Sequence, residues 1–501
     1  MTEVWSDGQA GATAIPRKLN LGVYDAALVD VVVTGRRLIQ DTRQLEPGDI
    51  FVALGNPALH HVDEAITLGA SAALVSDDAA NSNPTIVHRI ADLANVLPAM
   101  ADDFAGHPSA AMTVVGITGT NGKTSTAHLL TEAWEALGRA GATIGTLGAG
   151  ITGQPRINMG MTTPQVTTVQ QFLADFFAAG VEAVAVEVSS HALHQGRVAG
   201  VNFEIIVFTN LTRDHLDYHG TMAEYAAQKA KIFTLPGMRT AVVNLDDPFG
   251  AQHFGAVPAS VHWIGLSSNG HSDAVVQAHN VRFDPAGLSF DLVVDGITAP
   301  VRSELIGRFN VDNLLAVAGV LHGQGFDTNR IAEVLGALPP VLGRMTRIHP
   351  DPALPLVVVD AGHTPDAVRQ AVSALRQSGY ARIVTVFGAT GDRDPGKRPE
   401  MARIAEEGSE LVIVTDDDVH NEDGDRILDD IRRGFHHPEA VVEIRDRTAA
   451  IAYAIDAAGP ADVVLLQGKG HEPYQIIGDA RVPFSDLDTA RRLLQERSAR
   501  R

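Results

Sequence analysis

Short apolar runs separated by amphipathic segments recur along the whole chain. In the first hundred residues, runs at 49–54 and 72–76 predict strands, and segments 62–68 and 90–104 predict helices. From 108 to 340, apolar runs at 113–117, 181–188, 203–209 and 240–244 alternate with helical segments, which is typical of a parallel sheet with crossover helices. A second alternation has strands predicted at 354–360, 382–387, 410–415 and 462–466. The pattern therefore predicts an α/β protein.

Proline and glycine clusters divide this pattern into three predicted domains. Gly106-His107-Pro108 follows a helical segment, and 338–344 separates the two strand–helix alternations. We expect a small α/β domain at 1–107, a central domain with a mostly parallel sheet at 108–340, and a third, Rossmann-like α/β domain at 341–501. The two ends, 1–16 and 496–501, are expected to be poorly ordered.

Charge and cysteine usage narrow the function classes. The 501 residues carry a formal net charge of -21, which repels a phosphate backbone, so we expect no nucleic-acid partner. The chain has no cysteine, which excludes disulfides and thiolate chemistry and is consistent with the cytosol. No run reaches the ~18 apolar residues that span a bilayer, and no signal peptide pattern is visible. We expect a cytoplasmic monomer that binds small molecules and does not insert into a membrane.

The most informative motif lies between the predicted strand 113–117 and the helix that follows. It reads Gly116-Ile-Thr-Gly-Thr-Asn-Gly-Lys-Thr-Ser-Thr126. Glycines allow backbone N–H groups to surround phosphate oxygens, a lysine adds charge, and a threonine hydroxyl can bind Mg²⁺. A strict P-loop would have glycine in place of Ile117, so an unrelated glycine turn is the alternative. The expected phosphate-binding residues are Gly119, Thr120, Asn121, Gly122, Lys123, Thr124 and Ser125.

Possible metal ligands follow the next two predicted strands. Glu187 ends the run 181–188, and 210–220 contains Asp214, His215, Asp217 and His219. Carboxylates at the ends of nucleotide-binding strands commonly reach a metal ion. Taken singly, Glu187 could be a solvated strand end and His215 a buried, hydrogen-bonded histidine. Their similar position on what we take to be neighbouring strands favours a shared metal site.

The phosphate-binding loop resembles that of the Mur ligases and the folylpolyglutamate synthetases, which form amide bonds through an acyl phosphate. The strings at 187–193, 210–220 and 226–229 together are similar to the MurE branch of the Mur ligases, and the similarity extends from Asp41-Thr-Arg43 to Gly468-Lys-Gly-His-Glu472. The resemblance implies ATP as substrate, two Mg²⁺ ions, a UDP-binding N-terminal domain, a central ATPase domain and a C-terminal amino-acid-binding domain.

The resemblance also implies roles for single residues. Lys123, Glu187, His215 and Lys229 would be catalytic, with Thr124, Glu187, His215 and a Lys229 carbamylated by CO₂ as metal ligands. Asn310, Asn313, Arg344 and Asp360 would bind ATP; Thr42, Thr162, Thr163, Ser189, Gln195 and Arg197 would bind UDP-N-acetylmuramoyl-L-alanyl-D-glutamate. One departure is Ala361, which replaces the tyrosine usual near the nucleotide. Lys229 could instead be a surface lysine.

The added amino acid would be bound by Arg393, Asp417, Asp418, His420, Gly468 and Glu472. Enzymes that use meso-diaminopimelate have an arginine in the Asp-Asn-Pro-Arg motif; here Asp417-Asp418-Val419-His420 replaces that motif. With Asp416, Glu422 and Asp423, these residues suggest an anionic rim that attracts an ammonium group. We therefore expect L-lysine, or ornithine or diaminobutyrate; the alternative is meso-diaminopimelate bound by a protonated His420. Part of the acidic cluster could be a helix N-cap, and Lys397-Arg398 could be a solvated charge run.

The expected reaction is ATP-dependent addition of a diamino acid to the D-glutamyl γ-carboxylate, for peptidoglycan precursor synthesis. Three other functions stay open: a folylpolyglutamate synthetase, a P-loop ATPase acting on a protein partner, and a nucleotide-sugar-binding module without activity.

Overall fold

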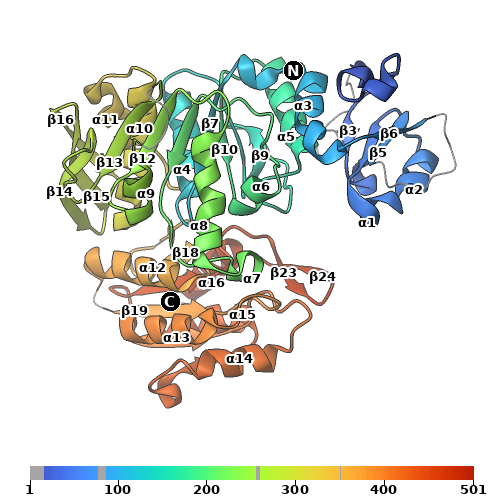
Figure 1. Cartoon of the computed structure of the whole chain (residues 1–501). Coiled ribbons are helices and arrows are strands. Elements are labelled where there is room, and N and C mark those ends of the chain that lie inside the picture. The colour runs from blue at the N-terminus through green and yellow to red at the C-terminus, as the bar shows by residue number, and fades with distance from the viewer. Residues whose placement is uncertain (1–15, 77–85, 256–259, 350, 381, 501) are drawn as a thin grey trace.

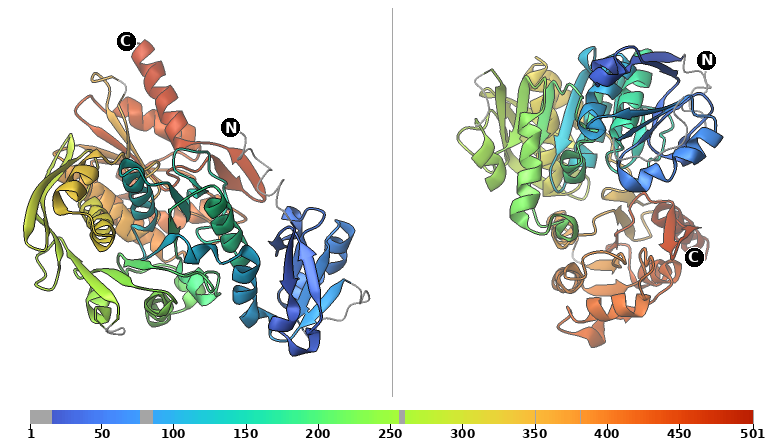
Figure 2. Two further views of the ribbon diagram at one scale, coloured as in Figure 1. Left: turned by 90° about the horizontal axis from the view of Figure 1, so that it is seen from above. Right: turned by 45° about the vertical axis from the view of Figure 1, so that its right-hand side comes forward.

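The computed structural model describes residues 16–500 except 77–85, 256–259, 350 and 381. Figure 1 shows three parts in chain order: an N-terminal lobe in blue, a central domain, and a C-terminal domain in orange and red below it. Each part has its own sheet with helices around it, which confirms the expected three-domain α/β fold. Seen from above in Figure 2, the N-terminal lobe stands to one side of the other two domains.

The N-terminal lobe contains a four-stranded parallel sheet in the order β3-β4-β5-β6 and a separate antiparallel pair, β1-β2. Helix α3 then connects the lobe to the central domain, and its apolar face packs into the same core as Val166 of the central domain. The bounds are β1 Arg17–Asn20, β2 Val32–Gly35, β3 Leu38–Ile39, β4 Ile50–Ala53, α1 Gly55–Leu59, α2 Val62–Thr67, β5 Ala72–Ser76, β6 Val87–Ile90 and α3 Leu93–Ala105.

The central domain is built on a ten-stranded sheet in the order β16-β15-β14-β13-β12-β11-β7-β10-β8-β9. The bounds are β7 Thr113–Thr118, α4 Lys123–Ala136, β8 Gly141–Gly145, β9 Gly148–Ile151, α5 Val166–Ala178, β10 Ala183–Glu187, α6 Ser190–His194, β11 Ile205–Phe208, α7 Leu216–His219, α8 Met222–Ala230, β12 Thr240–Asn244, α9 Pro248–His253, β13 His262–Ser267, β14 Val276–Asp284, β15 Gly287–Val294, β16 Ile297–Ser303, α10 Arg308–Gly323 and α11 Thr328–Ala337. Pairing is parallel from β8 across the sheet to β14, and antiparallel at β8-β9, β14-β15 and β15-β16.

Both faces of the central sheet are covered because its strands are apolar on both sides. In β7, Val114 packs into the core on one face, and Val115 and Ile117 pack into the core on the other. This alternation has the period of two that a strand imposes. All three side chains are fully buried, so Ile117 is a core residue and cannot be part of the loop that follows.

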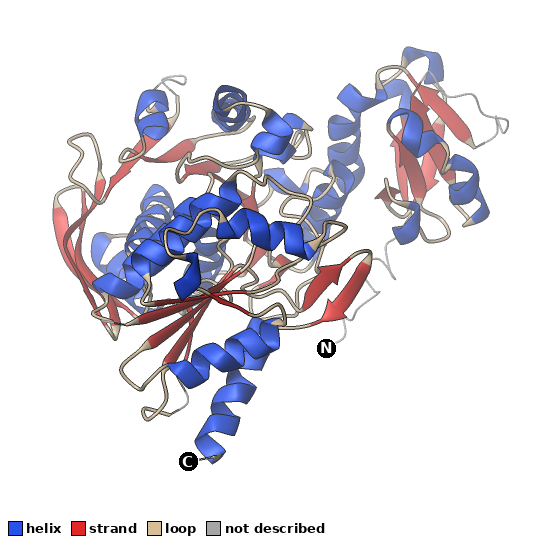
Figure 3. Ribbon diagram, turned by 90° about the horizontal axis from the view of Figure 1, so that it is seen from below, coloured by secondary structure: helices blue, strands red, loops and turns tan. Residues whose placement is uncertain are grey.

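The C-terminal domain has a six-stranded sheet in the order β17-β18-β22-β19-β20-β21, parallel except for β17. Figure 3, where this domain is nearest the viewer, shows helices on both sides of its strands; α12, α13 and α14 cover one core, and α15 and α16 the other. The bounds are β17 Thr346–Ile348, β18 Leu356–Asp360, α12 Pro365–Gln377, β19 Ile383–Phe387, α13 Lys397–Gly408, β20 Leu411–Val414, α14 Gly424–Arg432, β21 Val442–Glu443, α15 Arg447–Ala457, β22 Val463–Gln467, β23 Tyr474–Ile477, β24 Ala480–Pro483 and α16 Asp486–Ala499.

Two expectations about the elements were wrong in part. The helix expected at 90–104 begins at Leu93, because Ile90 belongs to β6. The end expected to be poorly ordered from 496 is helical through Ala499, since Leu493 and Leu494 anchor α16 in the domain core. Of the disorder expected at 1–16, residues 1–15 lie outside the described residues. The domain boundaries near 107 and 340 stay predictions.

Candidate active site

The phosphate-binding loop leaves the end of β7 and enters α4 at Lys123. Gly119 has φ 151°, and a Cβ there would collide with Thr209 Oγ1, so the turn requires glycine. The side chains of Lys123 and Lys229 converge on this loop. Both ammonium groups donate to the Gly119 carbonyl oxygen, Lys123 at 2.8 Å and Lys229 at 2.7 Å. The amino groups of two lysines therefore lie where phosphate groups would bind.

Lys229 is buried at this point, with 1% of its surface exposed. Burial lowers its pKa well below the ordinary value, and the nearby charge of Lys123 lowers it further. The alternative that Lys229 is a surface lysine is therefore wrong. A buried amine that loses its proton easily can act as a nucleophile.

Glu187, at the end of β10, is fully buried beside the loop. Its carboxylate accepts hydrogen bonds from the Thr124 hydroxyl at 2.8 Å and from the backbone N–H of Thr146 at 2.9 Å. A Cβ at Gly145 would collide with this carboxylate, so glycine at the end of β8 makes room for it. The alternative of a solvated strand end is wrong. A carboxylate and a threonine hydroxyl beside a phosphate loop are the oxygen ligands that Mg²⁺ prefers.

The strands that carry Glu187 and His215 are not neighbours, contrary to expectation. β7 lies between them and pairs with β10 on one side and β11 on the other. Glu187 ends β10 and His215 follows β11. Because both strands pair with β7, both residues lie close to the phosphate-binding loop. Burial lowers the pKa of His215 to about 4, so its ring is neutral and can bind a metal ion. Its Nε2 atom lies 3.3 Å from Asp214.

A hydrogen-bonded group surrounds the start of α6. The Thr163 hydroxyl donates to the Glu187 carbonyl oxygen at 2.6 Å, and the Arg197 guanidinium donates to the Thr163 carbonyl oxygen at 2.8 Å. Arg197 also donates to Gln195 at 2.9 Å. Thr163 also donates to Ser189 Oγ at 3.3 Å. The structure thus brings together these residues, with Thr162 nearby in the cavity wall. Thr42 lies apart in the N-terminal lobe, where it donates to Glu64 at 3.0 Å.

A small cavity of about 120 Å³ lies between the loop and α12. Its wall includes Asn121, Gly122, Ser125, Asn313, Arg344 and Asp360. Asn310 does not line this cavity; it accepts a hydrogen bond from Asn313 at 2.9 Å and so holds that side chain. Phe309 also lines it, which gives the cavity an aromatic side chain from α10 despite Ala361.

A larger cavity of about 820 Å³ lies between the central and C-terminal domains. The loop residues Thr120 to Ser125 and His215 line one part, and Thr162 lies beside them. Arg393, Asp417, Asp418, His420, Gly468 and Glu472 line the part formed by the C-terminal domain. Residues expected to bind phosphate, dipeptide and amino acid thus face one space.

The carboxylates of the expected anionic rim are partly compensated, because positively charged side chains of the protein pair with several of them. The buried Lys469 lies 2.7 Å from Asp418, 2.7 Å from Glu472 and 3.5 Å from Asp417. Glu422 pairs with Arg398 at 2.6 Å, and Asp416 pairs with Arg445 at 2.6 Å. The acidic helix cap is Asp423, not Asp417 or Asp418. These pairs weaken the expected attraction of the site for a basic substrate side chain.

Three residues of this site are not evident from the sequence pattern. Lys469 lies within the string 468–472 without a predicted role of its own, and Thr146 follows the glycine-rich β8, which has little apolar pattern. Arg398 was considered part of a solvated charge run, but it is fully buried. A βαβ rule would have suggested a strand after α4, and with it Thr146. The ion pairs of Lys469 with Asp418 and of Arg398 with Glu422 join residues far apart in the sequence, so no local pattern reveals them.

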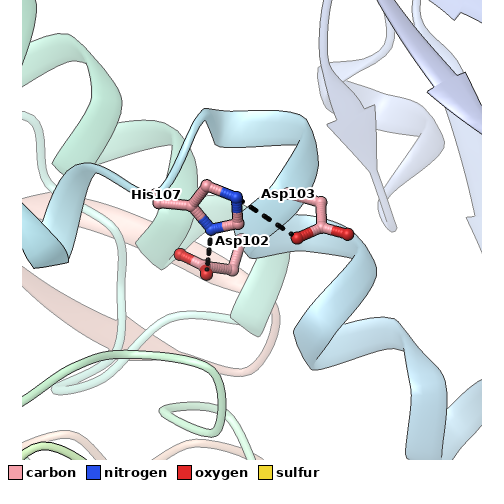
Figure 4. Close-up of side chains that lie close together, drawn as sticks. All are labelled: Asp102, Asp103 and His107. Carbon is pink, nitrogen blue, oxygen red and sulfur yellow. Dashed lines mark hydrogen bonds and ion pairs between the residues drawn. The ribbon is translucent and has the colours of Figure 1, made fainter.

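A group that could hold a metal ion elsewhere consists of Asp102, Asp103 and His107. Figure 4 shows the His107 ring between the two carboxylates, with Nδ1 2.8 Å from Asp102 and Nε2 3.5 Å from Asp103. The hydrogen bond to Asp102 raises the pKa of His107 above its ordinary value. The raised pKa favours the charged form of His107, which pairs with the two carboxylates at the end of α3.

Comparison with known proteins agrees with the fold and the site. Residues 117–321 match the Mur ligase middle domain, and residues 343–470 match the Mur ligase glutamate ligase domain. A UDP-N-acetylmuramoyl-L-alanyl-D-glutamate--2,6-diaminopimelate ligase of Xanthomonas campestris is 50% identical over 480 residues, which cover 95% of this chain and 96% of the relative. The enzyme of that name from Pseudomonas aeruginosa is 43% identical over 96% of this chain and 98% of its own.

Solved structures give the same result. A structure of a ligase with that name is 32% identical, with a TM-score of 0.65 over 93% of this chain and 95% of the other. A Mycobacterium tuberculosis folylpolyglutamate synthase, 21% identical with a TM-score of 0.59 over 74% of this chain and 91% of its own, shares the fold alone.

The fold and the site define an ATP-dependent ligase that forms amide bonds. The chain belongs to the Mur ligase family, and its relatives include ligases of the MurE type. These relatives are named as ligases of 2,6-diaminopimelate, and the expected L-lysine is not confirmed. No helix in the described part of the chain is long and apolar enough to cross a membrane.

Proposed function

We propose that this protein joins 2,6-diaminopimelate to the D-glutamyl γ-carboxylate of UDP-N-acetylmuramoyl-L-alanyl-D-glutamate, with hydrolysis of ATP to ADP and phosphate. The observation that carries the proposal is the cavity of about 820 Å³, because phosphate-loop residues, Thr162 of the expected dipeptide site and the expected amino-acid residues line one continuous space. An acyl phosphate formed at the loop could reach the amine without leaving the protein.

The reaction proceeds in two steps. An oxygen of the γ-carboxylate attacks the γ-phosphorus of ATP, the bond to the β-phosphate oxygen breaks, and ADP leaves. The amine nitrogen then attacks the acyl carbon, the C–O bond to phosphate breaks, and the amine proton passes to phosphate or water. Lys123 stabilises the charge on the transferring phosphoryl group, and positioning accounts for most of the acceleration.

The residues beside the loop fit divalent metal ions. Thr124 and Glu187 would hold one Mg²⁺, and His215 and Lys229 would contribute to a second. Bound Mg²⁺ neutralises phosphate charge and orients the oxygens of ATP and the carboxylate. The protein itself fixes Glu187 through Thr146, so this carboxylate is oriented before substrate binds.

Lys229 is proposed to be carbamylated. Its low pKa provides a neutral amine; the nitrogen attacks CO₂, a C–N bond forms, and one proton is released to solvent. The product is an anion on a long side chain. It would balance the charge of Lys123, which lies on the same Gly119 carbonyl.

The substrate proposal is supported by the names of the relatives and by the position of His420. Lys469 pairs with Asp417, Asp418 and Glu472, which offsets part of the negative charge that would attract a terminal ammonium. His420 lines the cavity on this side and could bind the distal carboxylate of diaminopimelate. Arg393, at the same end, would bind the α-carboxylate. The monomeric state and cytoplasmic location stay predictions.

An ADP-release assay with the purified protein tests the function. ADP should form only when the muramoyl dipeptide and an amino acid are both present, and mass spectrometry should show the amide product. In a competition among diaminopimelate, L-lysine, ornithine and diaminobutyrate, diaminopimelate should dominate. ADP release with folate and glutamate, or without any acceptor, would instead support one of the rival functions.

A second experiment tests carbamylation. With ¹³C-bicarbonate, the wild-type protein should give a carbamate carbon signal that Lys229→Arg lacks, because a guanidinium stays protonated. Activity should fall in degassed, bicarbonate-free buffer and return when bicarbonate is added. Full activity without CO₂ would contradict the proposal.

A further inference from the structure

One lysine that lines the large cavity has no partner in the described part of the chain. The side chain of Lys397 makes neither a hydrogen bond nor an ion pair there. The other lysines near the site are engaged. Lys123 and Lys229 donate to the Gly119 carbonyl oxygen, and the buried Lys469 pairs with three carboxylates. The reaction steps proposed above do not use Lys397.

The helix that carries Lys397 gives no reason for a lysine at this position. Lys397 is the first residue of α13, and no side chain caps this end of the helix. Because backbone N–H groups give a helix N-terminus partial positive charge, a cation there destabilises the helix. The neighbouring Arg398 pairs with Glu422 and Asp430, whereas Lys397 lines the cavity. The charge of Lys397 is therefore unfavourable for the helix and available to a bound anion.

Contacts across the domain border place the start of α13 beside the loop that carries His215. Arg213 of that loop lies 3.8 Å from Asp394, and a Cβ at Gly396 would lie 3.8 Å from the Arg213 guanidinium. Gly396 directly precedes Lys397 in the chain. The three charged side chains line the large cavity together with His215. Lys397 therefore approaches the phosphate end of the cavity from the C-terminal domain.

The electrostatic surroundings of Lys397 agree with this position. Burial lowers the pKa of Lys123, Lys229 and Lys397, and the negative charge of Asp214 opposes this effect in all three. The same carboxylate therefore lies near lysines of both domains. Asp417, at the amino-acid end, also acts to raise the pKa of Lys397. Lys397 thus lies between the phosphate end and the amino-acid end, where an acyl phosphate and an amine would meet.

We propose that Lys397 is a catalytic residue that binds the phosphate of the acyl phosphate from the side of the C-terminal domain. The inference rests on the proposed function. When the amine nitrogen forms its bond to the acyl carbon, the C–O bond breaks and its electron pair stays on the phosphate oxygen. A cation beside that oxygen stabilises the charge that develops there. Lys123 would thus assist transfer of the phosphoryl group from ATP, and Lys397 its departure as phosphate.

Inorganic phosphate is the product of this step and probes the contact without ligase activity. It can be titrated calorimetrically into the full-length protein saturated with ADP and Mg²⁺. Lys397→Met has a side chain of similar length without charge, and it should bind phosphate roughly tenfold more weakly, as expected for one charge-assisted hydrogen bond. Lys397→Arg keeps the charge and should bind phosphate about as tightly as the wild type. Equal affinities for ADP would show that both variants are folded.

Steady-state kinetics test the catalytic role. Lys397→Met should lower kcat roughly 100-fold with little change in the KM for the amino acid, because the contact forms with a charge that develops during the reaction. Lys397→Arg should recover part of kcat. The matched control is Arg403→Met, which removes an exposed cation of α13 that pairs with Glu407 at 2.8 Å. The control should leave kcat and the phosphate affinity unchanged.

Three results would overturn the inference. The wild type could fail to bind phosphate beside ADP. Lys397→Met could match the wild type in kcat and phosphate affinity, as a solvated lysine would. It could also raise the KM for the amino acid at unchanged phosphate affinity, which would assign Lys397 to a substrate carboxylate. Loss of phosphate binding in Lys397→Met, with no amide formed by the wild type, would instead reject the proposed function and keep the phosphate contact.

Discussion

At the scale of single residues, one buried cation determines the charge of the amino-acid end of the cavity. Burial opposes the charge of Lys469, but Asp417, Glu472 and Asp418 together raise its pKa above the ordinary value. The ammonium therefore stays charged and offsets part of the negative charge of these three carboxylates. The imidazole of His420 has no hydrogen bond within the described residues; only its backbone is fixed, to Ile476 and Gly478. It is available for a substrate group.

We predict that His420→Arg lowers the KM for diaminopimelate by roughly tenfold, because a guanidinium is always charged and can bind a carboxylate with two hydrogen bonds. The KM for ATP and kcat should change little. Steady-state kinetics with each substrate varied in turn measures this. His420→Ala should raise the KM for diaminopimelate. An equal gain for L-lysine in His420→Arg would contradict a contact with the distal carboxylate.

The phosphate loop and its neighbours could be predicted from sequence because their chemistry is local. Glycines, Lys123 and Thr124 follow one another, and the strand and helix around them have strong patterns. The amino-acid end could not be predicted. The charges of Asp417 and Asp418 are visible in the sequence, but their partner Lys469 is about fifty residues away, and burial decides the pairing.

At the scale of elements, two loops of the C-terminal domain hold each other in position. The loop before α13 carries Arg393 and the loop after β20 carries His420. Gly391 N–H donates to the Asp418 carbonyl at 2.8 Å, and Asn421 donates to Asp392 at 3.2 Å. The Arg398 guanidinium also donates hydrogen bonds to the carboxylates of Glu422 and Asp430 and to the Thr390 carbonyl oxygen. The backbone N–H of Asp392 donates to Glu422.

We predict that Glu422→Gln weakens the contacts between the two loops. It should lower the free energy of unfolding at neutral pH and reduce the dependence of that free energy on acid. The hydrogen bond from Arg398 lowers the pKa of Glu422 from 4.5 to about 2. The carboxylate therefore stabilises the fold above pH 4.5, and this stabilisation is lost as the pH falls toward 2. Urea unfolding should show a loss on the order of 2 kcal/mol at pH 7 for the variant and a smaller difference at pH 2.

The matched control is Glu443→Gln, which breaks an exposed pair with Arg432 of 2.7 Å. Its cost should be below ~1 kcal/mol. Glu422→Gln should also raise the KM for the amino acid more than the KM for ATP. Equal effects of the two variants on stability and KM would show that the loops do not depend on Glu422.

Buried parallel strands read as continuous apolar runs, and such runs predicted β4, β5, β7, β10, β11, β12, β18, β19, β20 and β22. The strands β8, β9 and β13 to β16 of the central sheet were not predicted. The predicted bounds of β12 are correct at both ends, and β18 begins two residues later than predicted. Strand order could not be predicted. The placement of β7 between β10 and β11 follows from the packing of crossover helices, which no single segment encodes.

At the scale of the whole molecule, the central and C-terminal domains meet around the phosphate loop. The Asn121 amide donates to Asp366 of α12 at 3.1 Å, and Arg344 donates to Thr124 at 3.3 Å. Figure 1 shows α7, which follows the His215 loop, at the border of the two domains. Both domains must approach to complete the cavity, so activity requires this arrangement.

We predict that Asp366→Ala shifts the protein without nucleotide toward a more open arrangement. Loss of one hydrogen bond of about 1 kcal/mol changes a two-state ratio by about fivefold. Because the chain has no cysteine, spin labels attach only at Phe177→Cys and Tyr453→Cys, which are 50% and 44% exposed on different domains. Pulsed electron resonance should show longer distances for the variant. A non-hydrolysable ATP analogue with Mg²⁺ should restore the wild-type distances, since it adds contacts to both domains. Identical distances with and without Asp366, together with reduced kcat, would mean that this carboxylate acts on the nucleotide and not on closure.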